Sequence, residues 1–184
     1  KYFFIIENIK DIKIKNIKRI NKYNIIYRFK DKQENLDKLL IFRKNCKAKG
    51  INFYVANDIK LAVLVKADGL YISAYNQNLR LRKIRNTNLQ IIGSAHNLRE
   101  LHIKKLQGCA EIIYSRIFET SYPYKEGFLG VIKFNLLKKS RKENLIPLGG
   151  IRTENLNKIK MISCNSFVVL SEIKKKPAII GRLF

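Results

Sequence analysis

Two adjacent glycines near the C-terminal end of the sequence offer a backbone site for an anion. Gly149 and Gly150 follow the apolar run Leu145–Leu148, and Thr153 stands where the N-cap of a helix is expected. Glycine lets the backbone come close to a ligand, and the amides at the start of a helix favour a negatively charged group. The segment predicts a phosphate-binding loop, with an ordinary tight turn before a capped helix as the alternative.

A serine and a histidine stand together at the end of another apolar run. Ser94 ends the run, His96 follows two residues later, and Asn97 precedes a stretch with helical spacing. At a strand end the hydroxyl and the imidazole would face a pocket, and a histidine titrates near neutral pH, which suits it to general acid or base catalysis. The alternative is a structural histidine beside Asn97, which would cap the helix.

Two cations mark the end of a third apolar run. Strand alternation places Arg28 and Lys30 on one side, with Tyr27 and Phe29 on the other. Placing two cations in one pocket costs free energy unless an anionic ligand neutralises their charge. The pair therefore indicates an anion site, and a solvated strand end is the alternative.

Elements that would position these residues recur along the chain. Eight apolar runs are predicted as strands: Tyr2–Ile6, Asn24–Phe29, Asn52–Ala56, Gly69–Ile72, Gln90–Ser94, Glu111–Ile117, Leu145–Leu148 and Phe167–Leu170. The stretches with helical spacing between them include Leu36–Lys49, Leu98–Gln107, Val131–Ser140 and Thr153–Met161. In Leu98–Gln107 the spacing of the apolar residues places Lys104 on the outer face.

This alternation predicts a compact (β/α)8 barrel, or TIM barrel, as a single domain over residues 1–184. Division of 184 residues by eight leaves 23 for each unit, enough for a strand of about five, a helix of about ten and two short loops. An open doubly wound sheet is the rival, because periodicity does not separate the two. In both architectures ligands bind at the carboxyl ends of the strands, and barrels commonly hold phosphate after strands seven and eight.

The sequence is strongly basic, with 38 lysines and arginines against 14 acidic residues and a net charge of +24. Such a charge brings nucleic acid or an anionic membrane to mind as a partner. Lysine, asparagine and isoleucine make up 73 of the 184 residues, and their A/T-rich codons indicate a coding bias behind the diffuse part of the charge. RNP-type, KH and zinc patterns are missing from the sequence, so nucleic acid is not expected as a partner.

Apolar runs and cysteines bear on the compartment. No window approaches the roughly 18 apolar residues of a spanning helix, and Tyr2–Ile6 is too short for a signal-peptide core, so a membrane partner is not expected. Cys46, Cys109 and Cys164 are odd in number and far apart. They suit a reduced cytoplasmic protein in which thiols pack as small apolar groups.

From residue 24 to residue 173 the sequence resembles the thiamine-phosphate synthase and TenI-type thiazole tautomerase family. The resemblance rests on the order and spacing of six stretches: Ile25–Lys30, Ala67–Leu70, Ile92–Leu98, Gly108–Thr120, Leu148–Ile151 and Val168–Ser171. It implies a barrel that joins a hydroxymethylpyrimidine pyrophosphate to a thiazole phosphate and releases pyrophosphate. The partners would be these phosphorylated small molecules, and the cofactor would be magnesium.

The resemblance also implies roles for particular residues. Pyrophosphate contacts would fall to Arg28, Lys30, Ser94, Thr120 and Lys125. The thiazole phosphate would lie on the backbone near Gly149, Gly150 and Ser171.

The family's magnesium-binding acidic positions are asparagines in this sequence. They fall on Asn57 and Asn76, which keep an oxygen ligand but lack the charge that magnesium favours, and Asp58 lies one residue beyond the first of them. Arg116 and Arg152 are further cations that would offset part of the missing metal charge.

Three hypotheses for function follow. The first is a synthase-like transferase with Ser94 in the site, in which Arg28, Lys30 and Lys125 stabilise the departing pyrophosphate. The second is a thiazole tautomerase, which needs no metal and would use His96 as a proton shuttle. The third is a catalytically degenerate barrel that binds a phosphate ligand.

Overall fold

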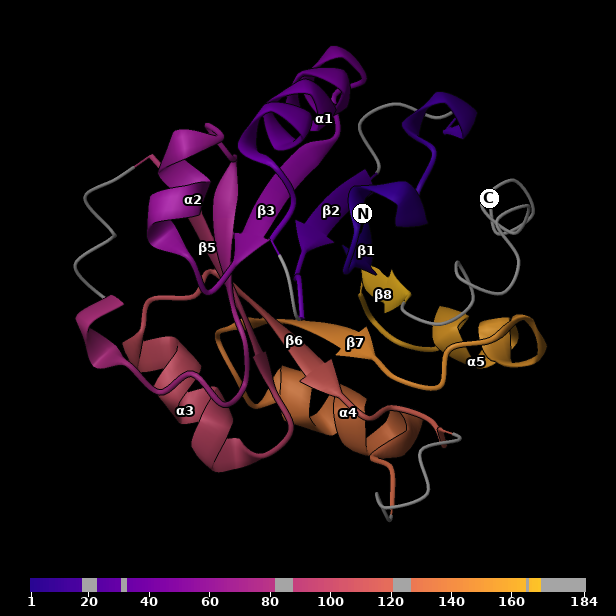
Figure 1. Cartoon of the computed structure of the whole chain (residues 1–184). Helices are drawn as coiled ribbons and strands as arrows, with labels where there is room; N and C mark the ends of the chain where they lie inside the picture. Colours follow the sequence, from indigo (N-terminus) through magenta and orange to yellow (C-terminus); the bar gives the residue numbers. More distant parts are fainter. Residues whose placement is uncertain (18–22, 31–32, 82–87, 121–126, 165, 170–184) are drawn as a thin grey trace.

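Eight parallel strands close into a barrel in the computed structural model (Figure 1), which describes residues 1–17, 23–30, 33–81, 88–120, 127–164 and 166–169. The strands follow sequence order around the barrel, and the first pairs with the last. Their bounds are β1 Tyr2–Ile6, β2 Tyr23–Tyr27, β3 Asn52–Ala56, β4 Gly69–Ile72, β5 Gln90–Ala95, β6 Glu111–Ser115, β7 Asn144–Leu148 and β8 Phe167–Val169. The predicted TIM barrel is confirmed, and the open sheet is excluded.

Helices cover the outside of the barrel (Figure 1). They are α1 Leu36–Ala48, α2 Ile59–Leu64, α3 Leu98–Leu106, α4 Gly130–Lys139 and α5 Leu156–Lys160, with short 3-10 turns η1 Ile9–Asp11, η2 Ile14–Asn16 and η4 Thr153–Asn155. Within the described part of the chain, no helix has the length and apolar character needed to span a bilayer.

The segment after β7 departs from the predicted helix over Thr153–Met161. Thr153 begins the 3-10 turn η4, and the residue at the N-cap position of α5 is Asn155. The side chain of Asn155 instead accepts a hydrogen bond from the Arg152 amide at 2.8 Å and donates one to the Gly150 carbonyl at 2.6 Å. This amide folds the loop back on the glycine pair, so the regular helix starts later than predicted.

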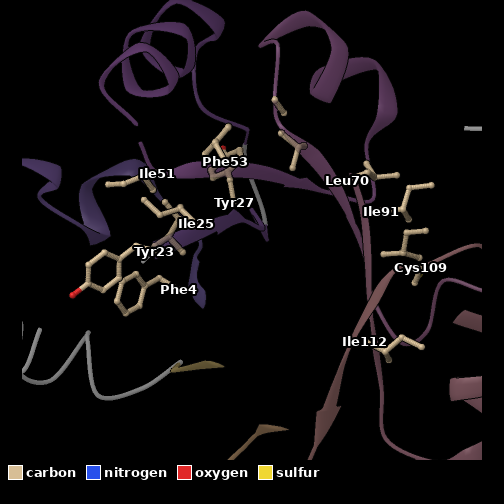
Figure 2. Close-up of a cluster of buried hydrophobic side chains, with 14 of the residues drawn as sticks. Phe4, Tyr23, Ile25, Tyr27, Ile51, Phe53, Leu70, Ile91, Cys109 and Ile112 are labelled. Carbon is tan, nitrogen blue, oxygen red and sulfur yellow. The ribbon is translucent and has the colours of Figure 1, made fainter. Parts of the chain in front are cut away.

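The barrel interior and its outer layer are both filled by apolar side chains. The interior cluster comprises Phe3, Ile5, Ile26, Tyr54, Ala56, Tyr71, Ile92, Ile113, Ile146 and Val168. A second cluster lies between the strands and the helices, and Figure 2 shows part of it, from Phe4 and Tyr23 round to Cys109 and Ile112. Because the interior is packed, ligands reach the barrel only at its ends.

The cysteines behave largely as apolar groups. Cys46 and Cys109 are buried, Cys164 is half-buried, and all three are free thiols. Burial raises the pKa of the Cys46 thiol to about 12, which keeps it protonated at neutral pH. The prediction of packed thiols is confirmed for the two buried residues.

Lys104 corrects the predicted orientation of α3, because it is fully buried rather than solvated. Its ammonium donates to the Asn76 carbonyl at 2.6 Å and to Gln107 Oε1 at 2.9 Å. The Gln107 amide donates in turn to the carbonyls of Asn76 and Asn78 at 2.9 and 3.1 Å. The side chain of Lys104 in α3 and that of Gln107, the C-cap residue of α3, therefore fix the loop that follows β4. The oxygen acceptors that surround its ammonium allow Lys104 to be buried.

Burial of Lys104 makes stability depend on pH. Desolvation lowers its pKa from 10.5 to about 8, and the charges of Cys109 and Glu100 oppose part of that shift. Between these two pH values the unfolded chain binds a proton that the folded chain has released, so this contribution to stability rises with pH. From pH 7.5 to 9.5 we expect the wild type to gain about 2 kcal/mol in unfolding free energy relative to Lys104→Met, measured by urea unfolding.

The exposed neighbour on the same helix is the matched control for this effect. Lys105 pairs with Glu143 at 3.0 Å, and its side chain is 57% exposed. The difference between the wild type and Lys105→Met should stay flat over the same pH range. A flat difference for Lys104→Met as well would contradict the buried, pKa-shifted ammonium.

Candidate functional site

A cavity of about 220 Å³ lies at the carboxyl ends of the strands. Its lining comes from the ends of β1, β2, β4, β5, β6 and β7 and the loops that follow: Ile5, Arg28, Tyr71, Ser73, Ala74, Tyr75, Ser94, His96, Ser115, Arg116, Thr120, Leu148 and Gly149. Two arginines and a histidine are among these described lining residues, and none of them is acidic. This composition suits an anionic ligand.

Arg28 is held at the cavity by the end of β2. Its amide donates to the Ile6 carbonyl at 2.8 Å, which continues the ladder to β1 one residue past the strand. Nearby, the Tyr71 hydroxyl donates to Ser94 Oγ at 2.8 Å. Burial raises the pKa of Tyr71, while the Ser94 hydrogen bond and the Arg28 guanidinium lower it in part. A neutral Tyr71 thus links the serine to the arginine.

Lys30 takes a different position from Arg28. Its ammonium pairs with the Glu7 carboxylate at 2.9 Å, its side chain is 63% exposed, and it is not among the described residues that line the cavity. The strand β2 ends at Tyr27 and its hydrogen bonding to β1 extends only to the Arg28 amide, so alternation no longer holds Lys30 beside Arg28. The structure brings only the first of the two predicted cations into the cavity.

Arg116 lies at the end of β6 as Arg28 lies at the end of β2. Its Nη1 donates to Thr120 Oγ1 at 2.6 Å, and its Nη2 donates to the Gly127 carbonyl at 2.8 Å. The loop after β6 therefore fixes the guanidinium, and Thr120 reaches the cavity in the same unit. Of the two extra cations considered from the sequence, Arg116 lines the cavity and Arg152 is exposed outside its described lining.

The glycine pair packs against this same loop. Gly149 and Gly150 have φ of +102° and +67°, a region that favours glycine. A Cβ at Gly150 would lie 2.3 Å from the Glu119 carbonyl oxygen, and one at Gly149 would lie 3.2 Å from Arg116 Cα. Both glycines are required for loop packing, and Gly149 also brings its backbone to the cavity.

His96 lines the cavity and is oriented by Glu100 in the first turn of α3. Its Nδ1 lies 3.0 Å from Glu100 Oε2, which also accepts the His96 amide at 2.7 Å. Asn97 accepts the Glu100 amide at 2.9 Å, so the predicted N-cap of α3 is confirmed. With Nδ1 engaged by the carboxylate, Nε2 is the ring atom left for a ligand.

Asn57 and Asn76, the two expected metal positions, contact each other directly. Asn57 Oδ1 accepts from the Ser73 amide and hydroxyl, both at 3.0 Å, and from Asn76 Nδ2 at 3.2 Å. Asn76 Oδ1 accepts the Asn78 amide at 3.1 Å, while Asp58 caps α2 by accepting the Leu61 amide at 2.9 Å.

These oxygens do not fit a magnesium ion. A carbonyl oxygen has two lone pairs, and three donors already surround that of Asn57, whereas magnesium demands near-octahedral oxygen ligands. Among the residues that the structure describes, no group of three or more His, Cys, Asp or Glu side chains is placed to hold a metal.

Two of the predicted site residues, and a second hollow in the fold, are not part of this cavity's described lining. Lys125 and Ser171 lie outside the described residues. A hollow of about 400 Å³ lies between η1, η2 and α1. There the Lys49 ammonium donates to the carbonyls of Ile14, Lys15 and Ile17, so this cation serves the fold.

The fold and the cavity define a TIM barrel with a basic cavity at the carboxyl ends of its strands. The family model for thiamine monophosphate synthase matches residues 13–173, and the chain belongs to that family.

Individual relatives agree with this assignment. The chain is 26% identical over 129 residues to a thiamine-phosphate synthase of Prochlorococcus marinus, covering 70% of this chain and 37% of the relative. It is 24% identical over 144 residues to that of Clostridioides difficile, covering 78% and 69%. A solved thiamine phosphate pyrophosphorylase from Pyrococcus furiosus superposes with a TM-score of 0.71 at 15% identity, covering 100% of this chain and 96% of that one, and shows the shared fold.

Proposed function

We propose that this chain is a thiamine-phosphate synthase, a transferase that joins a hydroxymethylpyrimidine pyrophosphate to a thiazole phosphate. The observation that carries the proposal is the gathering of Arg28, Ser94, Thr120 and Gly149 around one cavity. The resemblance assigned ligand contacts to all four, and they come from four different units of the barrel: Ser94 from the end of β5, the others from the segments after β2, β6 and β7. The family match over residues 13–173 supports the same reaction.

The reaction is a substitution at the pyrimidine methylene group. The bond from this carbon to pyrophosphate breaks and its electron pair leaves with the pyrophosphate oxygen, while the thiazole nitrogen uses its lone pair to form the new carbon–nitrogen bond. Fixed guanidinium groups at Arg28 and Arg116 stabilise the charge that develops on the leaving group. Because Ser94 accepts from Tyr71, its own proton is directed to another acceptor, and the substrate phosphate fills that role.

A direct assay tests this activity. The full chain, incubated with both precursors, should release thiamine phosphate and pyrophosphate in equal amounts, and neither should form when one precursor is omitted. Calorimetry with each precursor separates the outcomes that contradict a synthase. Binding without turnover would show a degenerate phosphate-binding barrel. The absence of both binding and turnover would rule out the family function for this chain.

Thiazole tautomerisation is the second candidate function, and the position of His96 favours it. The imidazole lines the cavity with Nδ1 bound to Glu100, an arrangement that suits a proton shuttle at Nε2. Under this alternative the wild type converts the thiazole tautomer and His96→Ala loses the activity. His102→Ala is the matched control, since His102 is exposed on α3, the helix that follows His96. Equal turnover by the wild type and His96→Ala would rule out this role.

We also infer that the described chain acts as one domain in a reducing cytoplasm. The pairing of β1 with β8, which joins Tyr2 to Phe167, supports the single domain. The buried free thiols of Cys46 and Cys109 support the compartment.

A further inference from the structure

The loops after β3 and β4 carry a neutral, self-satisfied amide pair where a metal site would need charge. Asn76 Nδ2 donates to Asn57 Oδ1, and Ser73 supplies two more donors to the same oxygen. To bind Asn57 Oδ1, a divalent cation would have to displace the Ser73 and Asn76 donors from that oxygen. Neither asparagine brings a negative charge that would offset the loss.

A buried cation is hydrogen-bonded to the backbone of Asn76, one member of this amide pair. The Lys104 ammonium donates to the Asn76 carbonyl at 2.6 Å and is fully buried. Like charges repel strongly where water is excluded, so a magnesium ion on Asn76 would be placed beside a fixed positive charge.

The cavity itself supplies positive charge in fixed positions. Arg28 and Arg116 enter it from β2 and β6, and the second guanidinium is held by Thr120 and the Gly127 carbonyl. A guanidinium forms charge-assisted, frequently bidentate hydrogen bonds with phosphate oxygens. Free pyrophosphate carries more negative charge than its magnesium complex, so such a site favours the free anion.

We propose that the cavity binds the pyrophosphate group as the metal-free anion, directly on Arg28 and Arg116, and not as a magnesium complex. The proposal rests on the proposed function, because it specifies the form in which that reaction's leaving group is held. The Asn57 and Asn76 pair acts as a neutral brace for the loops and not as a cation site.

Titration calorimetry with inorganic pyrophosphate tests this form of the ligand. In EDTA the wild type should bind pyrophosphate, and excess magnesium should weaken the apparent affinity about fivefold or more, because the complex has less charge for the guanidinium groups. Tighter binding with magnesium would overturn the proposal and leave the proposed function standing. An absence of binding under both conditions would overturn both.

Two pairs of variants locate the effect. In EDTA, Arg116→Gln should lower the affinity for pyrophosphate about tenfold, while Arg152→Gln, exposed and outside the described cavity lining, should change it little.

The double variant Asn57→Asp with Asn76→Asp should bind more weakly in EDTA and regain affinity when magnesium is added. Asn78→Asp adds a charge to the same loop through a side chain that accepts the Arg80 amide, while the contact of residue 78 with Asn76 is through its backbone amide, and this variant should keep the wild-type response. Thermal unfolding checks that each variant folds, and a double variant that folds yet ignores magnesium would contradict the role given to the asparagines.

Discussion

Arg28→Gln is expected to weaken pyrophosphate binding about 50-fold, the largest loss of affinity that the site predicts for a single side chain. The substitution removes one of the two guanidinium groups that line the cavity and the charge beside Tyr71 and Ser94. The amide of residue 28 still donates to the Ile6 carbonyl, so the strand end should keep its position. Calorimetry in EDTA measures the change, and thiamine phosphate formation should fall in parallel.

Lys30→Gln is the matched control for this variant. Both positions carry a cation at the end of the same strand, but the Lys30 ammonium pairs with Glu7 and its side chain is mostly exposed. We expect its affinity to stay within about threefold of wild type, as is usual for an exposed ion pair. Equal losses in the two variants would show that binding follows general positive charge and not the cavity.

Gly150→Ala is expected to reduce the unfolding free energy by about 3 kcal/mol, the largest loss of stability predicted for the site. The added Cβ would lie 2.3 Å from the Glu119 carbonyl oxygen and 2.7 Å from Phe118 backbone atoms, and φ at this position is +67°. Both obstacles are backbone, which cannot turn aside as a flexible side chain would. Urea unfolding measures the loss, and pyrophosphate affinity should also fall because the same loop carries Thr120.

Gly127→Ala separates steric contact from backbone conformation. Gly127 has φ of +72°, close to that of Gly150, but a Cβ there would meet nothing within 4 Å. With no contact from the described residues, its substitution should cost only the conformational strain, about 1 kcal/mol. If both variants lost the same stability, the close approach of the loops after β6 and β7 would not be what requires Gly150.

The barrel could be predicted from the sequence because its strands are buried on both faces. Such strands appear as continuous apolar runs, and all eight observed strands overlap the predicted ones. Lys104 could not be predicted, since helical spacing assigns lysine to the solvated face. Its burial depends on the Asn76 carbonyl, which lies 28 residues away in the sequence.

The site was predictable where a residue follows a strand end. Ser94, His96 and Gly149 follow clear apolar runs, and all three line the cavity. Arg116 was harder to place, because the predicted sixth strand continued to residue 117 and enclosed it, whereas the ladder of β6 ends at Ser115. The pairing of Lys30 with Glu7 joins the ends of two strands and leaves no local signal in the sequence.

The metal positions show how a resemblance and a structure inform each other. The resemblance located Asn57 and Asn76 as magnesium positions, and in the structure these two residues are in contact. Only the hydrogen bonds reveal that the amides satisfy each other and leave the oxygen of Asn57 surrounded by donors. From residue type alone, both asparagines could still have been weak metal ligands, because each has a side-chain oxygen.

A crystal structure of the full chain, grown with thiamine phosphate and pyrophosphate in the presence of EDTA, tests the central claim most directly. The account predicts pyrophosphate in the cavity at the carboxyl ends of the strands, with its oxygens within hydrogen-bonding distance of the guanidinium groups of Arg28 and Arg116. Pyrophosphate bound instead in the hollow beside Lys10, Lys15 and Lys49 would contradict it, and so would a cavity that is empty in EDTA and holds pyrophosphate only when magnesium replaces the EDTA.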